Sequence, residues 1–298
     1  MTLTTNLSPE VQQRVRATGL SAARVERVLR DALLEDLDGG VDVTTVATVS
    51  DRHRSTMDLV ARVGGTVCGL PFAEAVFAIA EPTAEATYHH HDGDRVAADT
   101  VLMSITGPTR GLLLAERTAL NILGHLSGIA TVTSAWVDAL AGTNAQVRDT
   151  RKTTPNLRAL EKYAVRCGGG QNHRMSLSDA ALVKDNHIAA AGSAAAAFEQ
   201  VRRRYPDLPV EVEVDSIEQL REVLEHGVQL VLLDNFTVEQ LREAVTVTAG
   251  RCRLEASGGL TLDNARDVAQ TGVDYLAVGA LTHSARNLDI AADLREVS

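Results

Sequence analysis

A run of charged and polar residues at positions 145–184 has the composition of an anion-binding site. It holds eight basic and three acidic residues, although the whole chain of 298 residues has a formal net charge of −10. A local excess of positive charge in an acidic protein suits a small polyanionic ligand, whereas a nucleic acid requires a broadly basic surface. We therefore expect a site for a small anion and no nucleic-acid partner.

The cations of this run are suited to binding carboxylates. They follow a short apolar strand (Arg151 and Lys152), belong to a polar cluster after three glycines (His173 and Arg174), and end the next apolar strand (Lys184). A guanidinium group forms paired hydrogen bonds with a carboxylate, so several such cations can neutralise and orient a ligand with two carboxylates. The glycine triplet fits neither nucleotide-binding fingerprint and predicts only a flexible loop.

Four later polar positions recur at a regular interval, each after or at the end of an apolar strand. Glu213, Asp234, Ser257 and Gly279 are 21, 23 and 22 residues apart. One strand, one helix and two short loops have about that length, so these residues occupy equivalent places, which in a barrel form the rim where active sites assemble. Glu213 and Asp234 are the best oxygen donors for Mg²⁺, and they could equally hold ribose hydroxyls.

The elements that must position these residues change in kind along the chain. Before residue 127 the sequence predicts amphipathic helices and then antiparallel strands, whereas from about Ala145 short apolar strands alternate with helices. This alternation predicts a parallel barrel or a doubly wound sheet. A long helix over residues 111–142, with a break near Ser127 and Gly128, joins the two parts. The polar end of the chain predicts a helix over residues 285–298.

Composition and cysteine spacing indicate the cellular compartment of the protein. The chain is 45% hydrophobic and has no apolar run of the roughly 18 residues that cross a bilayer, and its start lacks a signal-peptide core. Cys68, Cys167 and Cys252 are widely separated without a CxxC pair, so we expect reduced packing residues and neither disulfides nor a thiolate zinc site. These features predict a cytoplasmic protein without a membrane partner.

The sequence closely resembles the quinolinate phosphoribosyltransferase family over nearly its whole length. The matching segments, in chain order, are EDLDGGVDVTT, ERTALNILGHLSGIAT, DTRKTTPNLRALEKYAV, GGGQNHR, KDNH, EVEVDS, LLDNF, EASGG and VGALTHSA. The resemblance implies an α+β sandwich over residues 1–126 and an incomplete β/α barrel over residues 127–284, with the expected C-terminal helix packing back on the first domain. It also implies transfer of phosphoribose from phosphoribosyl pyrophosphate to quinolinate with loss of CO₂, in NAD biosynthesis.

The family pattern assigns roles to individual residues. It implies that quinolinate is held by Arg117, Arg151, His173, Arg174 and Lys184, and that Arg117 reaches the site of a partner subunit in a homodimer. For phosphoribosyl pyrophosphate, residues 257–259 (Ser257, Gly258, Gly259) and 279–283 lie where the last barrel loops bind phosphate. Lys152, with help from His283, would meet the pyrophosphate, and Thr150, Thr153 and Asn172 would supply hydrogen bonds. Asn156 and Ser176 replace glycines that are usual in the family, which puts local loop geometry in question.

Other interpretations remain open from the residues alone. A related barrel phosphoribosyltransferase could act on another pyridine or anionic base without decarboxylation. Lys184 could instead be the amine of a Schiff-base lyase. A barrel that binds an anionic metabolite without catalysis is a further alternative, but it would not need Glu213 and Asp234.

Overall fold

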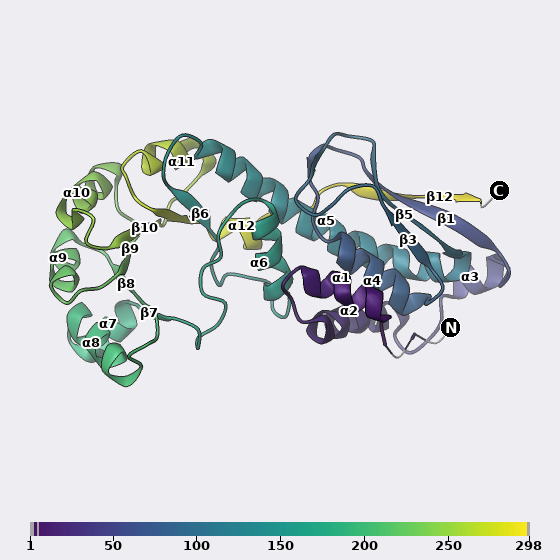
Figure 1. The fold of residues 1–298 in the computed structure, drawn as a ribbon, viewed down its shortest axis with the longest axis horizontal. Coiled ribbons are helices and arrows are strands. Elements are labelled where there is room, and N and C mark those ends of the chain that lie inside the picture. Colours follow the sequence, from purple (N-terminus) through teal and green to yellow (C-terminus); the bar gives the residue numbers. More distant parts are fainter. Residues whose placement is uncertain (1–2, 5, 297–298) are drawn as a thin grey trace. The chain divides into compact units, whose positions relative to one another are not determined.

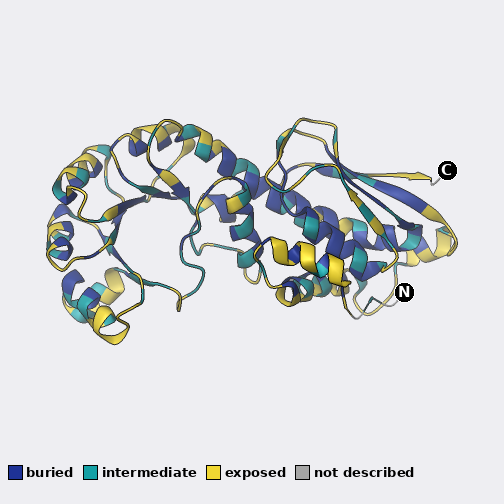
Figure 2. Cartoon of the chain, in the orientation of Figure 1, coloured by how far each residue is buried: buried dark blue, intermediate teal, exposed yellow. Residues whose placement is uncertain are grey.

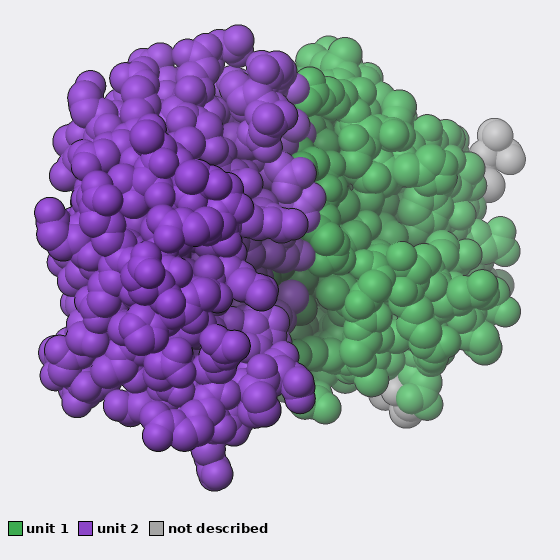
Figure 3. All heavy atoms as spheres, turned by 60° about the vertical axis from the view of Figure 1, so that its left-hand side comes forward, with its two compact units in different colours: residues 1–132, 154–169, 285–298 green, residues 133–153, 170–284 purple. Residues whose placement is uncertain are grey.

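The computed structural model describes residues 3–4 and 6–296, which form two compact units. Unit 1 comprises residues 1–132, 154–169 and 285–298, and unit 2 comprises residues 133–153 and 170–284 (Figure 3). The chain therefore enters each unit more than once, a division more interleaved than one boundary between residues 126 and 127. No helix in the described part of the chain is both long and apolar enough to cross a membrane.

Unit 1 is an antiparallel sheet packed with helices. Its four-stranded sheet has the order β12-β1-β5-β3, and β2 pairs with β4 in a separate ribbon. The strands are β1 (Arg54–Ala61), β2 (Gly65–Thr66), β3 (Glu85–Tyr88), β4 (Arg95–Val96), β5 (Thr100–Pro108) and β12 (Ile290–Glu296). The helices are α1 (Pro9–Ala17), α2 (Ala22–Leu37), α3 (Val43–Thr48), α4 (Leu70–Ala80), the first part of α5 (Thr109–Ala139) and α6 (Arg158–Cys167).

The core of unit 1 surrounds α4, whose sequence LPFAEAVFAIA is apolar on nearly every face. Phe72, Phe77 and Ile79 are at most 1% exposed. A helix that is hydrophobic all round must be covered on all sides, and α1, α2 and β5 all contact α4. This burial is visible as the dark interior of the α1–α4 region in Figure 2.

Unit 2 is a curved parallel sheet with helices on its outer side (Figure 1). Its six strands have the order β6-β11-β10-β9-β8-β7, and no pairing joins β6 to β7 among the described residues, so the barrel is incomplete as expected. The strands are β6 (Gln146–Arg148), β7 (Ala181–Val183), β8 (Val210–Val214), β9 (Leu230–Asp234), β10 (Arg253–Ser257) and β11 (Tyr275–Ala277). The helices are α7 (Asp185–Ala191), α8 (Ala194–Arg204), α9 (Ile217–Glu225), α10 (Val238–Thr248), α11 (Leu262–Ala269) and α12 (Ala280–His283).

The expected C-terminal helix over residues 285–298 is wrong, because the described end of the chain forms β12. This strand lies antiparallel to β1, with Ile290 opposite Ala61 and Glu296 opposite Ser55. Its polar side chains are those of an edge strand that faces solvent, and Arg295 donates to Asp58 across the pair at 2.8 Å. The segment belongs to unit 1, where β12 pairs with β1.

The expected helix break near Ser127 and Gly128 is also wrong, since α5 runs without interruption from Thr109 to Ala139. Gly128 is needed for packing. A Cβ atom added there would lie 2.0 Å from the carbonyl oxygen of Arg286. A glycine inside a helix therefore marks close backbone approach here, and it permits the segment before β12 to lie against α5.

Candidate active site

The carboxyl ends of the unit 2 strands surround a cavity of about 730 Å³. Strand register explains which side chains reach it. Glu213, Leu232 and Glu255 form one layer across β8, β9 and β10, and Asp234 and Ser257 form the next. Because side chains two residues apart on a strand point to the same face, one set of alternate positions lines this cavity.

Thirteen of the fourteen site residues expected from the sequence line this one cavity. They come from the loops after β6 and β11, the segment before β7, and the ends of β7 to β10: Thr150, Arg151, Lys152, His173, Arg174, Lys184, Glu213, Asp234, Ser257, Gly258, Gly259, Gly279 and His283. The regular spacing thus brings Glu213, Asp234, Ser257 and Gly279 to the carboxyl ends of successive strands, but only Asp234 and Ser257 are register partners. Glu213 is paired with Leu232, and Gly279 lies two residues beyond Ala277, the partner of Ser257. Arg117, the fourteenth, is an exposed residue of α5 in unit 1. Thr153 and Asn172, which were expected to supply hydrogen bonds, also lie outside the cavity lining.

The cationic part of the cavity is built around Arg151 and Arg174. Burial and the positive charge of Arg151 lower the pKa of Arg174, whose Nη1 donates to the carbonyl of Ala180 at 2.9 Å. The Nε atoms of both arginines are buried and lack a hydrogen-bond partner among the described residues. A buried donor without a hydrogen-bond partner raises the free energy of the protein, and an anionic ligand that accepts its hydrogen bond would remove this cost.

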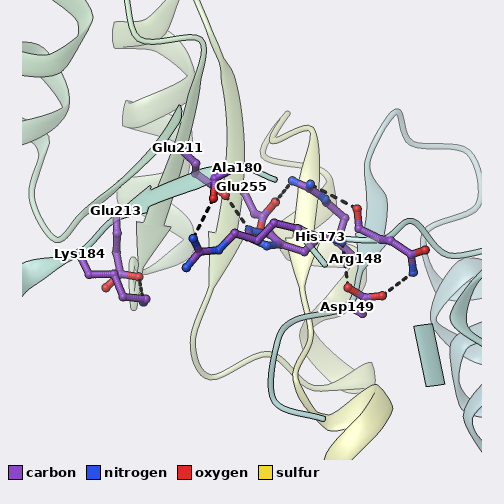
Figure 4. Close-up of polar contacts among 10 residues, drawn as sticks. Arg148, Asp149, His173, Ala180, Lys184, Glu211, Glu213 and Glu255 are labelled. Carbon is purple, nitrogen blue, oxygen red and sulfur yellow. Dashed lines mark hydrogen bonds and ion pairs between the residues drawn. The ribbon is translucent and has the colours of Figure 1, made fainter. Parts of the chain in front are cut away.

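Lys184 and Glu213 form an ion pair at the end of β7 and β8 (Figure 4). Asp234, at the end of β9, accepts a hydrogen bond from the side chain of Asn235 at 2.8 Å. The two carboxylates therefore stand on neighbouring strands, each with one protein partner already in place.

The loop after β10 is glycine-rich for a steric reason. Gly258 has φ +88°, and a Cβ atom there would lie 2.1 Å from Oδ1 of Asn235. Gly259 also has positive φ, at +62°, and the backbone N–H of Asn235 donates to the carbonyl of Ser257 at 2.9 Å. This geometry keeps the loop backbone bare of side chains beside the cavity.

Lys152 lies beside the turn that follows β11. Its carbonyl accepts a hydrogen bond from the hydroxyl of Thr282 at 2.7 Å. A Cβ atom at Gly279 would lie 2.9 Å from Cδ of Lys152 and 3.2 Å from Nε2 of His283. The absence of a side chain at Gly279 therefore leaves room for the side chains of Lys152 and His283.

A buried charged cluster below the cations was not expected from the sequence. Nε2 of His173 lies 2.6 Å from Glu211 and 3.6 Å from Glu255, and Glu255 forms an ion pair with Arg148 (Figure 4). The segment EVEV contained a usable indication of Glu211, because Glu211 and Glu213 are two residues apart on one strand and so share a face. Glu255 is likewise two residues before Ser257.

Asp149 holds the loop that carries His173 and Asn172. Its Oδ1 accepts from the backbone N–H of His173 at 2.9 Å, and its Oδ2 accepts from the side chain of Asn172 at 2.5 Å. Asp149 is fully buried. A carboxylate that receives two such hydrogen bonds fixes the loop carrying His173 and Arg174.

Two groups of described residues bring three potential metal-ligand atoms within 4.8 Å of one another. Cys68, Asp92 and Cys167 meet in unit 1, so two of the three cysteines are neighbours although the sequence separates them; all three are free thiols. The second group is His173, Glu211 and Glu255. Arg148 already supplies the counter-charge to Glu255, and we assign neither group as a metal centre.

Comparison with known proteins places the chain in a family. Residues 42–127 match the model of the quinolinate phosphoribosyl transferase N-terminal domain, and residues 129–293 match that of its C-terminal domain. The chain is 52% identical over 273 residues to the nicotinate-nucleotide pyrophosphorylase [carboxylating] of Mycobacterium leprae, covering 89% of this chain and 95% of that protein. The chain belongs to the quinolinate phosphoribosyltransferase family.

Further relatives agree in sequence and in structure. The probable nicotinate-nucleotide pyrophosphorylase [carboxylating] of Bacillus subtilis is 38% identical over 272 residues, covering 91% of this chain and 93% of that one. The crystal structure of NadC from Streptococcus pyogenes superposes with a TM-score of 0.90 at 41% identity, covering 94% and 99% of the two chains. The chain therefore has the family's antiparallel α+β domain and parallel α/β domain, and its activity belongs to NAD biosynthesis.

The two departures from the family pattern are accommodated locally. Asn156 has φ +68°, the left-handed region that favours glycine and that asparagine also tolerates. The backbone N–H of Ser176 donates to Asp179 at 3.0 Å, and its hydroxyl contacts the same carboxylate at 3.2 Å. Each replacement therefore keeps a tight turn in this quinolinate phosphoribosyltransferase without occupying the cavity.

Proposed function

We propose that quinolinate and phosphoribosyl pyrophosphate meet in the cavity at the carboxyl ends of β7 to β11, giving nicotinate mononucleotide, pyrophosphate and CO₂. The observation that carries the proposal is the convergence on one cavity of Arg151 and Arg174, with unpartnered Nε donors, beside Glu213 and Asp234. A product assay by mass spectrometry with both substrates and Mg²⁺ tests it. Nicotinate mononucleotide with stoichiometric CO₂ is the expected result, and a ribosylated product that keeps both carboxylates would contradict it.

In this proposal the cations recognise the two carboxylates of quinolinate. Arg151, Arg174 and Lys184, with His173, hold and orient the ring, since guanidinium–carboxylate pairs are bidentate and specific. A pyridine with a single carboxylate would leave part of this buried positive charge unpaired, which favours quinolinate over nicotinate. Lys184 is ion-paired with Glu213, which argues against its use as a neutral Schiff-base amine.

The phosphoribosyl donor would bind along the other side of the cavity. The bare backbone of residues 257–259 suits the 5′-phosphate, and Gly279 leaves space there too. Lys152, assisted by His283 and with Thr150 donating a hydrogen bond, faces the pyrophosphate. As the pyrophosphate leaves, these groups stabilise its charge, so the ribose carbon can become electron-poor before the pyridine nitrogen bonds to it.

Glu213 and Asp234 fit a magnesium ion by donor type, because Mg²⁺ binds one or two carboxylates together with water and substrate oxygens. When bound there, the ion would neutralise charge on the pyrophosphate. The same carboxylates can accept hydrogen bonds from ribose hydroxyls. Glu213 would exchange its partner Lys184 for either ligand, which leaves Lys184 available to quinolinate.

Removing either carboxylate should change the response to magnesium. We expect Glu213→Gln and Asp234→Asn each to lower kcat by about 10-fold or more and to raise the Mg²⁺ concentration for half-maximal rate, because an amide is a weak ligand for a hard cation. A magnesium titration of initial rates measures both effects. Asp263→Asn, which changes an exposed carboxylate on α11, is the control. A wild-type titration curve in both cavity variants would remove these residues from the site.

Arg117 would act across a homodimer. It is exposed on α5, and no ion pair or hydrogen bond is found for it within residues 3–4 and 6–296, so it has no evident role in its own chain. If each site borrows Arg117 from its partner, Arg117→Ala and Asp234→Asn chains should complement each other. Random reassembly of the two impaired proteins would regenerate about a quarter of the wild-type sites, above the residual activity of either variant.

Activity after co-refolding the two variants is the measurement for this subunit exchange. Recovery to about that level, with a dimer seen by light scattering, is the expected result. A mixture as inactive as its components would assign Arg117 to its own chain or to no site.

A reducing compartment such as the cytoplasm fits the cysteines. Cys68 and Cys167 have sulfur atoms within 4.8 Å of each other and remain unbonded. Neighbouring thiols persist where glutathione and thioredoxin keep them reduced.

A further inference from the structure

The proposed reaction requires a proton, and none of the residue roles assigned so far supplies it. When the carboxylate on C2 of ribosylated quinolinate leaves as CO₂, the electron pair of the broken bond stays on C2. The product carries hydrogen at that carbon, so one proton must be delivered. The arginines of the cavity do not give up protons at physiological pH, and Lys152 and Lys184 already have the roles of binding pyrophosphate and quinolinate. The step needs a proton donor of its own, and this inference rests on the proposed function.

Glu255 is the buried acid of the cavity. It lies on β10, its side chain is 0% exposed, and it is one of the residues that line the cavity. Its Oε1 has no hydrogen-bond partner among the described residues. The carboxyl group is thus held on one side by Arg148 of β6 while its other oxygen is left without a donor.

A second buried carboxylate lies close to Glu255. Glu211 of β8 lies across the same imidazole, with His173 Nε2 at 2.6 Å from Glu211 and 3.6 Å from Glu255. An ionised carboxylate can only accept a hydrogen bond, so Nε2 of His173 donates its proton to Glu211. The side chain of Glu211 is only 6% exposed. Two buried carboxylates repel each other, and holding a proton on one of them relieves this repulsion.

The same arrangement explains the acidity of Glu255. Burial is the first cause and the negative charge of Glu211 the second, and together they raise the pKa of Glu255 to about 7 against the opposing charges of Arg148 and His173. Its register neighbours are Leu232 on β9, which is apolar, and Tyr275 on β11, whose ring lies against the Arg148 guanidinium at 4.6 Å. An acid with a pKa near the working pH can both hold and release a proton.

We propose that Glu255 is the catalytic acid that protonates C2 after CO₂ departs. The O–H bond of the Glu255 carboxyl breaks, the C2–H bond forms with the electron pair left by decarboxylation, and Glu255 becomes a carboxylate. A proton taken up from solvent restores the carboxyl group before the next turnover. Glu211 is a positioning residue, whose negative charge raises the pKa of Glu255 and whose carboxylate holds His173 in place.

Single-turnover measurements across pH test this role. In the wild-type enzyme the rate of nicotinate mononucleotide formation should fall as pH rises through about 7, because the acid must be protonated. Glu255→Gln preserves the shape of the side chain but cannot donate a proton to carbon, so it should be slower by about 100-fold. It should also lack the fall in rate at high pH, which is the basic limb of the pH profile. In an equal mixture of H₂O and D₂O, the ratio of hydrogen to deuterium at C2, read by NMR, should also differ between the two enzymes.

Glu211→Gln is the matched control, because it removes one negative charge from the same cluster without removing the proposed acid. Its basic limb should remain but move to lower pH, since Glu211 is one cause of the raised pKa of Glu255. If circular dichroism shows that Glu255→Gln does not fold, Glu211→Gln still tests whether Glu255 is the acid. A limb that stays at the wild-type pH would then overturn the proposal.

Other outcomes distinguish the hypothesis that Glu255 is the acid from the proposed function of the whole site. A Glu255→Gln enzyme with the wild-type basic limb and the wild-type isotope ratio would exclude Glu255 as the acid while leaving the proposed function intact. A wild-type enzyme that shows no basic limb near neutral pH would exclude it too. A wild-type enzyme that makes no nicotinate mononucleotide would instead overturn the proposed function.

Discussion

An Arg174→Ala enzyme is expected to lose about 10- to 100-fold in kcat/KM for quinolinate, while KM for phosphoribosyl pyrophosphate changes little. A charge-assisted hydrogen bond contributes roughly 1.5 to 3 kcal/mol, which corresponds to this range. Arg174 is desolvated and faces the like charge of Arg151, so its guanidinium is held at a cost that a dianionic ligand offsets. Steady-state kinetics with each substrate varied in turn measures the effect.

The same variant should not be less stable than the wild type. Removing Arg174 relieves burial of a charge and its repulsion from Arg151, and these gains offset the lost hydrogen bond to the Ala180 carbonyl. Arg174→Lys keeps the charge but loses the planar fork, so it should recover only part of the activity. Arg203→Ala, an exposed arginine of α8, controls for loss of positive charge alone. Unchanged quinolinate kinetics in Arg174→Ala would refute its assignment.

Gly128→Ala is expected to destabilise unit 1 by about 3 kcal/mol, at the upper end of overpacking effects. The new methyl group would lie 2.0 Å from the carbonyl oxygen of Arg286 and 2.9 Å from its carbonyl carbon, and backbone cannot move aside as a flexible side chain can. Either α5 bends or the segment leading to β12 lifts away. Urea unfolding, followed by circular dichroism, gives the change in free energy of unfolding.

Gly124 provides a graded comparison one turn earlier on α5. A Cβ atom there would lie 3.0 Å from the carbonyl oxygen of Leu288, a contact that a shift of a few tenths of an ångström relieves. Gly124→Ala should therefore cost about 1 kcal/mol. Equal destabilisation by the two substitutions would show that helix flexibility matters here and that the close backbone approach does not.

The sequence was most informative where a periodic pattern and a chemical requirement coincided. Glu213, Asp234, Ser257 and Gly279 recur at the length of one strand–helix unit, and because such units repeat their geometry, equal spacing predicted a shared rim. Gly128 was interpreted by propensity as a helix break, whereas tertiary contact with Arg286 is what requires glycine there. Likewise, the polar end of the chain lacks a strong strand pattern, and pairing with β1 decides its structure.

The buried cluster was harder to predict because its members gain meaning only through proximity. Arg148, His173, Glu211 and Glu255 come from four separate segments, and a lone glutamate in an apolar strand does not reveal its partner. The pairing of Glu255 with Arg148, across 107 residues of sequence, depends on β6 returning to the sheet beside β11. Local patterns cannot specify such an arrangement, although the inward register of EVEV could have indicated Glu211.

The position of β12 at the edge of the unit 1 sheet has a consequence for biosynthesis. Ile290–Glu296 pair with β1, which is translated more than two hundred residues earlier. At about 5 to 20 residues per second, β1 would wait for roughly ten seconds or longer with that edge uncovered. The nascent chain would therefore present an open strand edge until β12 has been made, and a chaperone that shields this edge would matter most during that interval.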